Sequence, residues 1–224
     1  MDAPLLEVRG LDVAAPDGTP LLAGVSLTLE AGEERLLVGP SGLGKSTLLR
    51  TLAGLHAPPG EAVRLRGRTL RAHGAARWRR QLTYAHQKPT LGPETVLAAL
   101  ARPFAYAAAG APFDGAAAKA ALEALGLPGD VGGRAASSLS VGEQQRVHVL
   151  RALLVAEAVA LLDEPDASLD AATAERLDAY LARRRDAGLA VLRISHRPPA
   201  GAGTFDLEPF RAPGRANPAE GAAT

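Results

Sequence analysis

The chain has 224 residues, enough for one large domain or two small ones with a buried hydrophobic core. Its 25 basic and 24 acidic residues leave a net charge of +1, so we expect no nucleic acid partner. The absence of cysteine excludes disulfides and thiolate metal sites. We find no uncharged apolar run long enough to span a membrane, and no basic and apolar leader at the N-terminus.

The first residues alternate apolar and polar side chains, as strands of a half-exposed sheet do. This pattern predicts strands over 5–13 and 21–29, with a Pro-Asp-Gly turn at 16–18 between them. The apolar run 35–38 predicts a buried strand, and residues 48–55 have the composition of a helix. A glycine-rich loop therefore stands between a strand and a helix.

That loop reads Gly-Pro-Ser-Gly-Leu-Gly-Lys-Ser-Thr and matches a phosphate-binding loop in full. Its glycines let backbone N–H groups turn toward phosphate oxygens, and the next helix adds its positive end. In such loops the lysine reaches the β- and γ-phosphates and the serine hydroxyl holds Mg²⁺. A chance match is the alternative, and the flanking strand and helix argue against it. The predicted nucleotide-binding residues are Gly39, Pro40, Ser41, Gly42, Leu43, Gly44, Lys45, Ser46 and Thr47.

Downstream of the loop, strands and helices alternate along the chain. A Pro-Pro-Gly break at 58–60 is followed by a short strand over 63–66 and by alanine-rich helical sequence over 94–127. Later elements are a helix over 140–156, a strand over 159–162, a helix over 171–185 and a strand over 190–195. The alternation predicts an α/β fold with a mostly parallel sheet covered on both faces.

The same patterns predict how the chain divides into parts. Residues 88–154 supply helices without a clear strand, which predicts a helical subdomain inserted into a core of 1–87 and 155–197. Residues 198–224 are rich in proline, glycine and alanine and lack apolar periodicity. We therefore predict one domain over 1–197 and a loop-rich or disordered tail over 198–224.

Two acidic residues follow the buried apolar strand at 159–162. Asp163 is placed to coordinate Mg²⁺, directly or through water. Glu164 stands next to it, where a carboxylate facing the γ-phosphate can serve as a general base or orient the attacking water. The alternative is a strand end capped by surface acids, which the complete phosphate loop upstream disfavours.

The segment Ser138-Leu-Ser-Val-Gly-Glu-Gln-Gln-Arg146 predicts a second helix N-terminus. Ser140 and Glu143 have capping-box spacing, and Gly142 permits close approach to the backbone. Such an end presents free N–H groups and a hydroxyl, so it can bind a phosphate. Standing alone, the motif would be an ordinary capped helix.

Together these segments resemble the ATP-binding cassette (ABC) family over residues 5–197. Leu139-Ser-Val-Gly-Glu143 matches the family's signature motif, and Ser168-Leu-Asp170 matches its D-loop. Gln87 stands where the family has a glutamine after a strand, and His196 where it has a histidine that ends a later strand. The resemblance implies a P-loop ATPase with an antiparallel β subdomain and an inserted helical subdomain.

The resemblance also implies a mechanism and partners. Two copies stack head to tail around two Mg-ATP, so that each site combines the phosphate loop, Gln87, Asp163, Glu164 and His196 with Ser140 and Gly142 of the other copy. Glu164, His196 and Gln87 take the catalytic roles, and Ser46, Asp163 and Gln87 contact Mg²⁺. A single cassette without a membrane span is similar to the ATPase subunit of a transporter. That subunit lies on the cytoplasmic face of the membrane and contacts a separate permease near the Gln87 loop and the helical subdomain.

Local similarity narrows the type of cassette. Residues 84–91, 94–96 and 102–104 look like the small bacterial subunits implicated in iron export and metal tolerance. Alternatives are a cassette for another substrate, such as an amino acid or a lipid, and an ATP-dependent clamp or regulator that is not coupled to transport. The arginine-rich stretch 64–80 is read as a solvated face, with lipid or partner contact as the alternative.

Two positions depart from the family pattern. Residues 14–16 lack the aromatic side chain on which the family stacks adenine, which predicts weak selectivity for the base. Val141 stands in the signature where glycine is common.

Overall fold

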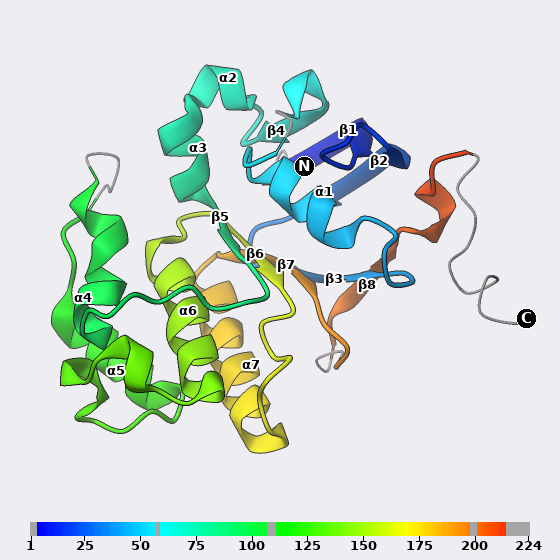
Figure 1. Cartoon of the computed structure of the whole chain (residues 1–224). Coiled ribbons are helices and arrows are strands. Elements are labelled where there is room, and N and C mark those ends of the chain that lie inside the picture. The colour runs from blue at the N-terminus through cyan, green and yellow to red at the C-terminus, as the bar shows by residue number, and fades with distance from the viewer. Residues whose placement is uncertain (1–3, 57–58, 107–110, 198–200, 214–224) are drawn as a thin grey trace, which may run out of the picture.

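The protein contains two β-sheets with a helix between them (Figure 1). A computed structural model describes residues 4–56, 59–106, 111–197 and 201–213. The smaller sheet is antiparallel and has the strand order β2-β1-β4, with β1 at Leu6–Ala14, β2 at Pro20–Leu29 and β4 at Val63–Leu65. The alternating burial of β1 and β2 confirms the half-exposed sheet predicted for the two early apolar patterns.

The larger sheet is parallel throughout and has the order β5-β6-β7-β3-β8. Its strands are β3 Glu34–Val38, β5 Leu82–Ala85, β6 Val159–Asp163, β7 Ala190–Ile194 and β8 Gly203–Asp206. Every residue of β6 and β7 is buried, because helices cover both faces of the sheet at its centre. The α/β fold with a mostly parallel sheet and an antiparallel sheet is confirmed.

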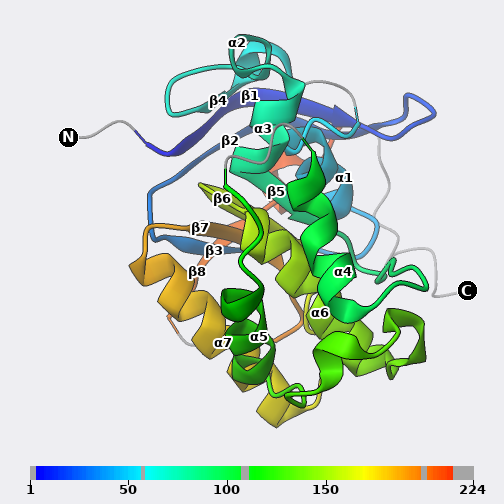
Figure 2. The same cartoon turned by 90° about the vertical axis from the view of Figure 1, so that its left-hand side faces the viewer.

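The helices divide between the two faces of the parallel sheet. Helix α1 (Lys45–Leu52) lies between the two sheets, whereas α6 (Val141–Val155) and α7 (Ala171–Asp186) lie on the opposite face (Figures 1 and 2). The remaining helices are α2 Leu70–His73, α3 Ala75–Gln81, α4 Val96–Ala101 and α5 Gly115–Ala124. Short 3₁₀ turns occupy Gly60–Ala62, Arg102–Ala105, Val131–Gly133, Ala136–Ser138 and Glu208–Phe210.

Two hydrophobic clusters meet across the parallel sheet. Leu161 on β6 belongs to the cluster that also contains α1 and the antiparallel sheet. Its neighbour Leu162 points to the other face and joins the cluster formed with α4 to α7. This alternation is the ordinary consequence of successive side chains pointing to opposite faces of a strand. It anchors β6 from both sides, and β6 carries Asp163 at its end.

The segment 88–154 contains the helices α4, α5 and α6, and within its described residues the only pairing of strand type is an isolated bridge between Thr95 and Ala135. Helix α6 also contacts β5 and β6, so it joins this segment to the parallel sheet. The division into a core and an inserted helical subdomain stays a prediction.

The interpretation of 198–224 as a loop-rich or disordered tail is wrong for part of that segment. Residues 203–206 form β8, which pairs with β3 along the edge of the parallel sheet. The ring of Phe205 stacks on that of Phe210, with 5.6 Å between the two ring centroids. The strand is short and mostly exposed, so it lacks the apolar periodicity from which a strand can be predicted. It forms because the edge of β3 offers unpaired backbone groups. Residues 198–200 and 214–224 lie outside the described residues.

The arginine-rich stretch contains two helices, α2 and α3, that the sequence pattern did not predict. Trp78 on α3 is fully buried and donates from its indole to the carbonyl of Leu52, so α3 is fastened to α1. Arg66 after β4, Arg71 on α2 and Arg77 on α3 are exposed, as expected for a solvated face.

A buried arginine links the centre of the parallel sheet to α7. Arg193 on β7 has 1% of its side chain exposed, and its Nη1 donates to Asp178 of α7 at 2.8 Å. Its Nε lies 3.2 Å from Oε1 of Glu34, which is itself buried and is also paired with Arg185. A buried charge that loses its partner is costly, so these groups stabilise the structure as a set.

We expect Arg193→Met to lower the free energy of unfolding by about 3 kcal/mol, because it leaves Glu34 buried with one partner fewer. The matched control is Arg64→Met, which removes an exposed ion pair with Glu61 and should cost less than about 1 kcal/mol. Urea denaturation can be followed through the fluorescence of Trp78, the single tryptophan of the chain. Equal losses in the two variants would contradict the role assigned to Arg193.

Candidate nucleotide-binding site

The phosphate loop connects β3 to α1, as the sequence predicts. Gly39 has φ 144° and Gly44 has φ 116°, values in the left-handed region that favours glycine. A Cβ on Gly39 would lie 2.7 Å from Cδ2 of Leu43, so a side chain there would require Leu43 to move. Gly44 precedes α1 without a side-chain cap, and the first N–H groups of the helix therefore face the loop opening.

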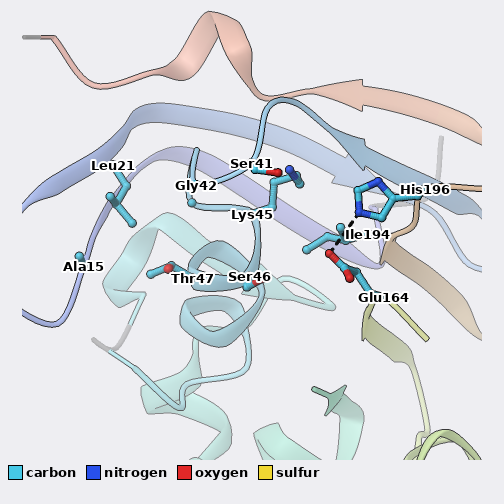
Figure 3. Close-up of a pocket in the computed structure, with 11 residues that line it drawn as sticks. Ala15, Leu21, Ser41, Gly42, Lys45, Ser46, Thr47, Glu164, Ile194 and His196 are labelled. Carbon is cyan, nitrogen blue, oxygen red and sulfur yellow. Dashed lines mark ion pairs between the residues drawn. The ribbon is translucent and has the colours of Figure 1, made fainter. Parts of the chain in front are cut away.

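A cavity of about 440 Å³ opens beside this loop (Figure 3). Its volume lies within the usual range for small-molecule sites. Several of the predicted nucleotide-binding residues line it together with Glu164 and His196, which arrive from the ends of β6 and β7. The lining residues are Ala15, Leu21, Ser41, Gly42, Gly44, Lys45, Ser46, Thr47, Glu164, Ile194 and His196.

Lys45 supplies the positive charge of the loop. Its ammonium donates to the carbonyl oxygens of Gly39 at 2.7 Å and of Pro40 at 3.0 Å. Burial lowers the pKa of Lys45, and the charges of Glu164 and Asp163 act against that shift. The ammonium is thus held at the mouth of the loop, between backbone carbonyls and two carboxylates.

The predicted magnesium ligands Ser46 and Asp163 are in contact. Asp163 is 2% exposed, and its Oδ1 accepts a hydrogen bond from the Ser46 hydroxyl at 2.9 Å. A hydroxyl and a carboxylate are hard oxygen ligands, which suit Mg²⁺. No cluster of three or more His, Cys, Asp or Glu side chains able to hold a metal occurs among the described residues. The Ser46 hydroxyl and the Asp163 carboxylate fit Mg²⁺, which is usually bound by one or two protein oxygens together with phosphate and water.

Glu164 is the point on which three elements converge. Oε2 of its carboxylate accepts a hydrogen bond from Nε2 of Gln87 at 2.6 Å, and Oε1 lies 3.4 Å from Nε2 of His196. The His196 side chain is 77% exposed, so it can contact a molecule in the cavity. Gln87 contacts Glu164 through its amide nitrogen, and its predicted contact with Mg²⁺ stays a prediction.

The backbone of Glu164 has φ 49°, an uncommon value for a residue other than glycine. Its N–H donates to the carbonyl of Ile194 at 3.0 Å, which extends the pairing of β6 with β7 by one residue. The buried amide of Gln145, on α6, lies 3.4 Å from the carbonyl oxygens of Glu164 and Pro165. Gln145 is a supporting residue that the sequence motifs did not single out.

Two further side chains hold the loops that carry the site. The Ser195 hydroxyl, next to His196, donates to Asp166 at 2.6 Å. His148 of α6 lies with its Nε2 3.1 Å from the carbonyl of His86, next to Gln87, and accepts from Arg151 at its Nδ1. Burial, with His86 and Arg151 nearby, lowers the pKa of His148 to about 3, so its ring is neutral and its Nε2 carries the proton.

The two predicted signature residues lie elsewhere. Ser140 caps α6, where its hydroxyl accepts from the N–H of Glu143 and the Glu143 carboxylate accepts from the N–H of Ser140. This is the capping box that the spacing predicted. Neither Ser140 nor Gly142 lines the cavity beside the phosphate loop. Helix α6 has 15 residues, so its length of roughly 22 Å separates Gly142 from the start of β6.

The fold and the site define a P-loop nucleotide-binding protein of the α/β class. A family model described as ABC transporter matches residues 22–167, and the chain belongs to this family.

Several relatives resemble the chain over most of its length. It is 38% identical to the lipoprotein-releasing system ATP-binding protein LolD of Ruegeria pomeroyi, covering 88% of the chain and 90% of LolD. It is 32% identical to the "Probable iron export ATP-binding protein FetA" of Escherichia coli, covering 87% of the chain and 86% of FetA. It is 36% identical to the spermidine/putrescine import ATP-binding protein PotA of Pseudomonas aeruginosa over 88% of the chain. The chain spans only about half of PotA, 53% of its length.

Solved structures agree with the fold. A structure titled "Structure of ATP binding subunit of ABC transporter" superposes with a TM-score of 0.73 at 28% identity, covering 86% of this chain and 79% of the other.

The position of Ala15 in the cavity generates a prediction about base recognition. An aromatic ring at this place adds a stacking surface, and stacking one base is worth about 1–3 kcal/mol. We expect Ala15→Tyr to tighten ATP binding roughly tenfold. Ala15→Leu, which adds bulk without a ring, should leave the affinity near that of wild type. Competition of ATP and of GTP against a fluorescent nucleotide measures the affinity of each variant and its selectivity for the base. A strong preference of the wild type for ATP over GTP would contradict the prediction of weak base selectivity.

Proposed function

We propose that the chain is the ATP-hydrolysing subunit of an ABC transporter. The observation that carries this proposal is the convergence of Lys45, Ser46 and Glu164 on one cavity beside the phosphate loop. Asp163 lies behind Ser46 and accepts its hydrogen bond. Hydrolysis by a loop that binds triphosphate needs a group that orients the attacking water beside the γ-phosphate, and a carboxylate can also accept the proton of that water. Glu164 is such a carboxylate, which favours hydrolysis over a clamp that only holds ATP.

The proposed roles follow from the contacts of each side chain. Lys45 neutralises charge on the β- and γ-phosphates, and the loop N–H groups hold the remaining oxygens. Glu164 orients the attacking water and accepts its proton, while Gln87 and His196 hold the carboxylate from two sides. Ser46 and Asp163 would hold Mg²⁺, with Gln87 beside them, and the ion would neutralise charge on the phosphate oxygens.

We further propose that two copies of the chain form the complete sites as a homodimer. The N-terminus of α6, with Ser140 and Gly142, is removed from the cavity of its own chain by the length of the helix. In a head-to-tail pair with twofold symmetry, the α6 end of each copy can reach the phosphates held by the other. The N–H groups of Val141 and Gly142 and the Ser140 hydroxyl would then complete the site.

The membrane partner is part of the proposal as well. None of the helices in the described part of the chain is long and apolar enough to cross a bilayer. We propose that a separate permease provides the translocation path, that it contacts the cassette near the Gln87 loop, and that the cassette sits on the cytoplasmic face of the membrane. Leu55 is exposed beside this loop and gives it an apolar contact surface.

For the transported substrate we propose a metal, exported in the manner named for FetA. Support comes from the FetA relative, which the chain matches over most of both lengths, and from the sequence 84–91. LolD and PotA are named for lipoprotein release and for spermidine and putrescine import. The sequence shared by these relatives therefore does not by itself distinguish one transported substrate from another.

The central test of the hydrolysis proposal is Glu164→Gln. Removing the general base should lower the turnover of ATP at least about a hundredfold while nucleotide binding persists. The variant should accumulate as an ATP-bound dimer in the presence of Mg²⁺, detected by size-exclusion chromatography with light scattering. The matched control is Glu157→Gln, which changes a surface carboxylate paired with Arg80 and should keep wild-type turnover.

The double variant Ser140→Ala, Glu164→Gln tests the shared site. Loss of the signature hydroxyl should return this protein to a monomer, with circular dichroism confirming that α6 remains folded. A Glu164→Gln protein that stays monomeric with saturating Mg-ATP would overturn the dimer. A wild type that binds ATP without hydrolysing it, even with its membrane partner, would favour the clamp.

The substrate proposal is tested in the source organism. Deletion of the gene should make growth more sensitive to added iron, with restoration by the wild-type gene and none by a Glu164→Gln copy. Unchanged iron sensitivity, or a defect confined to polyamine uptake or lipoprotein release, would contradict metal export.

A further inference from the structure

Tyr84 is a residue of the site that the motifs did not identify. It lies on β5, three residues before Gln87, and its phenol donates a hydrogen bond to Oδ2 of Asp163 at 2.8 Å. The phenol oxygen in turn accepts a hydrogen bond from Nε of Arg50 at 3.2 Å. Asp163 therefore has an ordered partner on each of its two oxygens, Ser46 on Oδ1 and Tyr84 on Oδ2.

Both partners are fixed to the same helix. Ser46 and Arg50 are four residues apart on α1, so they lie on one face of that helix. Ser46 contacts Asp163 directly, and Arg50 contacts it through Tyr84. The carboxylate is thus held at two points against the helix that carries the phosphate loop. It cannot turn about its last bond without breaking one of these hydrogen bonds.

The structure assigns Tyr84 as a positioning residue for Asp163, one that keeps Oδ1 turned toward Ser46 and toward the proposed magnesium ion. The assignment rests on the proposed function only in taking Mg-nucleotide as the ligand. Groups that orient a metal ligand in this way affect metal affinity strongly, and their loss commonly costs 10-fold to 100-fold.

The phenol also lies at the wall of a second cavity. This cavity, of about 490 Å³, is lined by Arg50, Leu55, Tyr84, His86, Gln87 and Lys88. Gln87 donates a hydrogen bond to Glu164, and Tyr84 donates one to Asp163, so the short stretch 84–87 holds both acidic residues of the site. Through Arg50 and Tyr84 this cavity is connected to Asp163, whereas through Gln87 it is connected to Glu164.

The test is the dependence of nucleotide binding on Mg²⁺ in Tyr84→Phe, which removes one hydroxyl and keeps the ring. Binding of a fluorescent ATP analogue is titrated with MgCl₂, and the same analogue is bound in EDTA. We expect the half-saturating Mg²⁺ concentration to rise about tenfold, because Oδ2 loses its partner and the carboxylate can rotate. Binding in EDTA should be unchanged, since Tyr84 does not line the nucleotide cavity.

The matched control is Thr83→Val, which removes the hydroxyl of the preceding residue. That hydroxyl donates to backbone carbonyls of Arg79 and Arg80 and does not touch Asp163, so the Mg²⁺ titration should match wild type. Arg50→Met is the second variant: its side chain is exposed, so folding is preserved, and it should shift the titration in the same direction by a smaller factor.

A Tyr84→Phe titration that coincides with wild type and with Thr83→Val would overturn the assignment. So would a loss of binding in EDTA equal to the loss in Mg²⁺, because it would show a general defect of the site. A wild type that binds no nucleotide at any Mg²⁺ concentration would instead refute the proposed function, so the two failures are distinguishable.

Discussion

The arrangement of the site depends on the fixed position of one strand end. Strand β6 is buried on both faces and ends at Asp163, and Glu164 follows it at the carboxyl end of the parallel strands. Helix α1 holds Asp163 through Ser46, and the Gln87 loop and the end of β7 hold Glu164 from two sides. Glu164 lies one residue beyond the strand, where its backbone turns to a φ of 49°, so the neighbouring acids can serve different partners. One acid faces the phosphate loop and the other faces the cavity.

The packing around β6 explains why this end is rigid. Leu161 and Leu162 enter different hydrophobic clusters, so a shift of the strand would disturb both cores at once. Arg193 on the neighbouring strand is buried, and its ion pair with Asp178 ties the sheet to α7. Gln145 connects α6 to the turn after Glu164. The turn itself requires support, because Glu164 adopts a φ that is unfavourable for a residue with a side chain.

The two ends of helix α6 contribute to different sites. Its C-terminal half packs beneath the sheet and holds the Gln87 loop through His148, while its N-terminus carries Ser140 and Gly142 far from the cavity. One helix therefore contacts the Gln87 loop of its own site and also carries the residues that we propose complete the site of a second copy.

Much of the site was predictable because short motifs specify local backbone chemistry. The glycines at 39 and 44, the capping box at 140–143 and the apolar run before Asp163 each act within a few residues, and each formed the expected element. Strand β8 was missed because an exposed edge strand carries no periodicity, and α3 was missed because one buried tryptophan among arginines hides its apolar face. Predicting either element requires knowing which part of the fold it packs against, and the local sequence does not give that information.

The sequence by itself determined the family, the phosphate loop and the identity of the acidic pair, because those features are set by consecutive residues. Only the tertiary structure decided which side chains support them. Tyr84, Gln145, Asp166 and Arg193 are distant in sequence from the groups they contact, and no spacing rule links them. Their roles arise from the way the strands are ordered in the sheet, where β5, β6 and β7 lie side by side although long helical segments separate them in the chain.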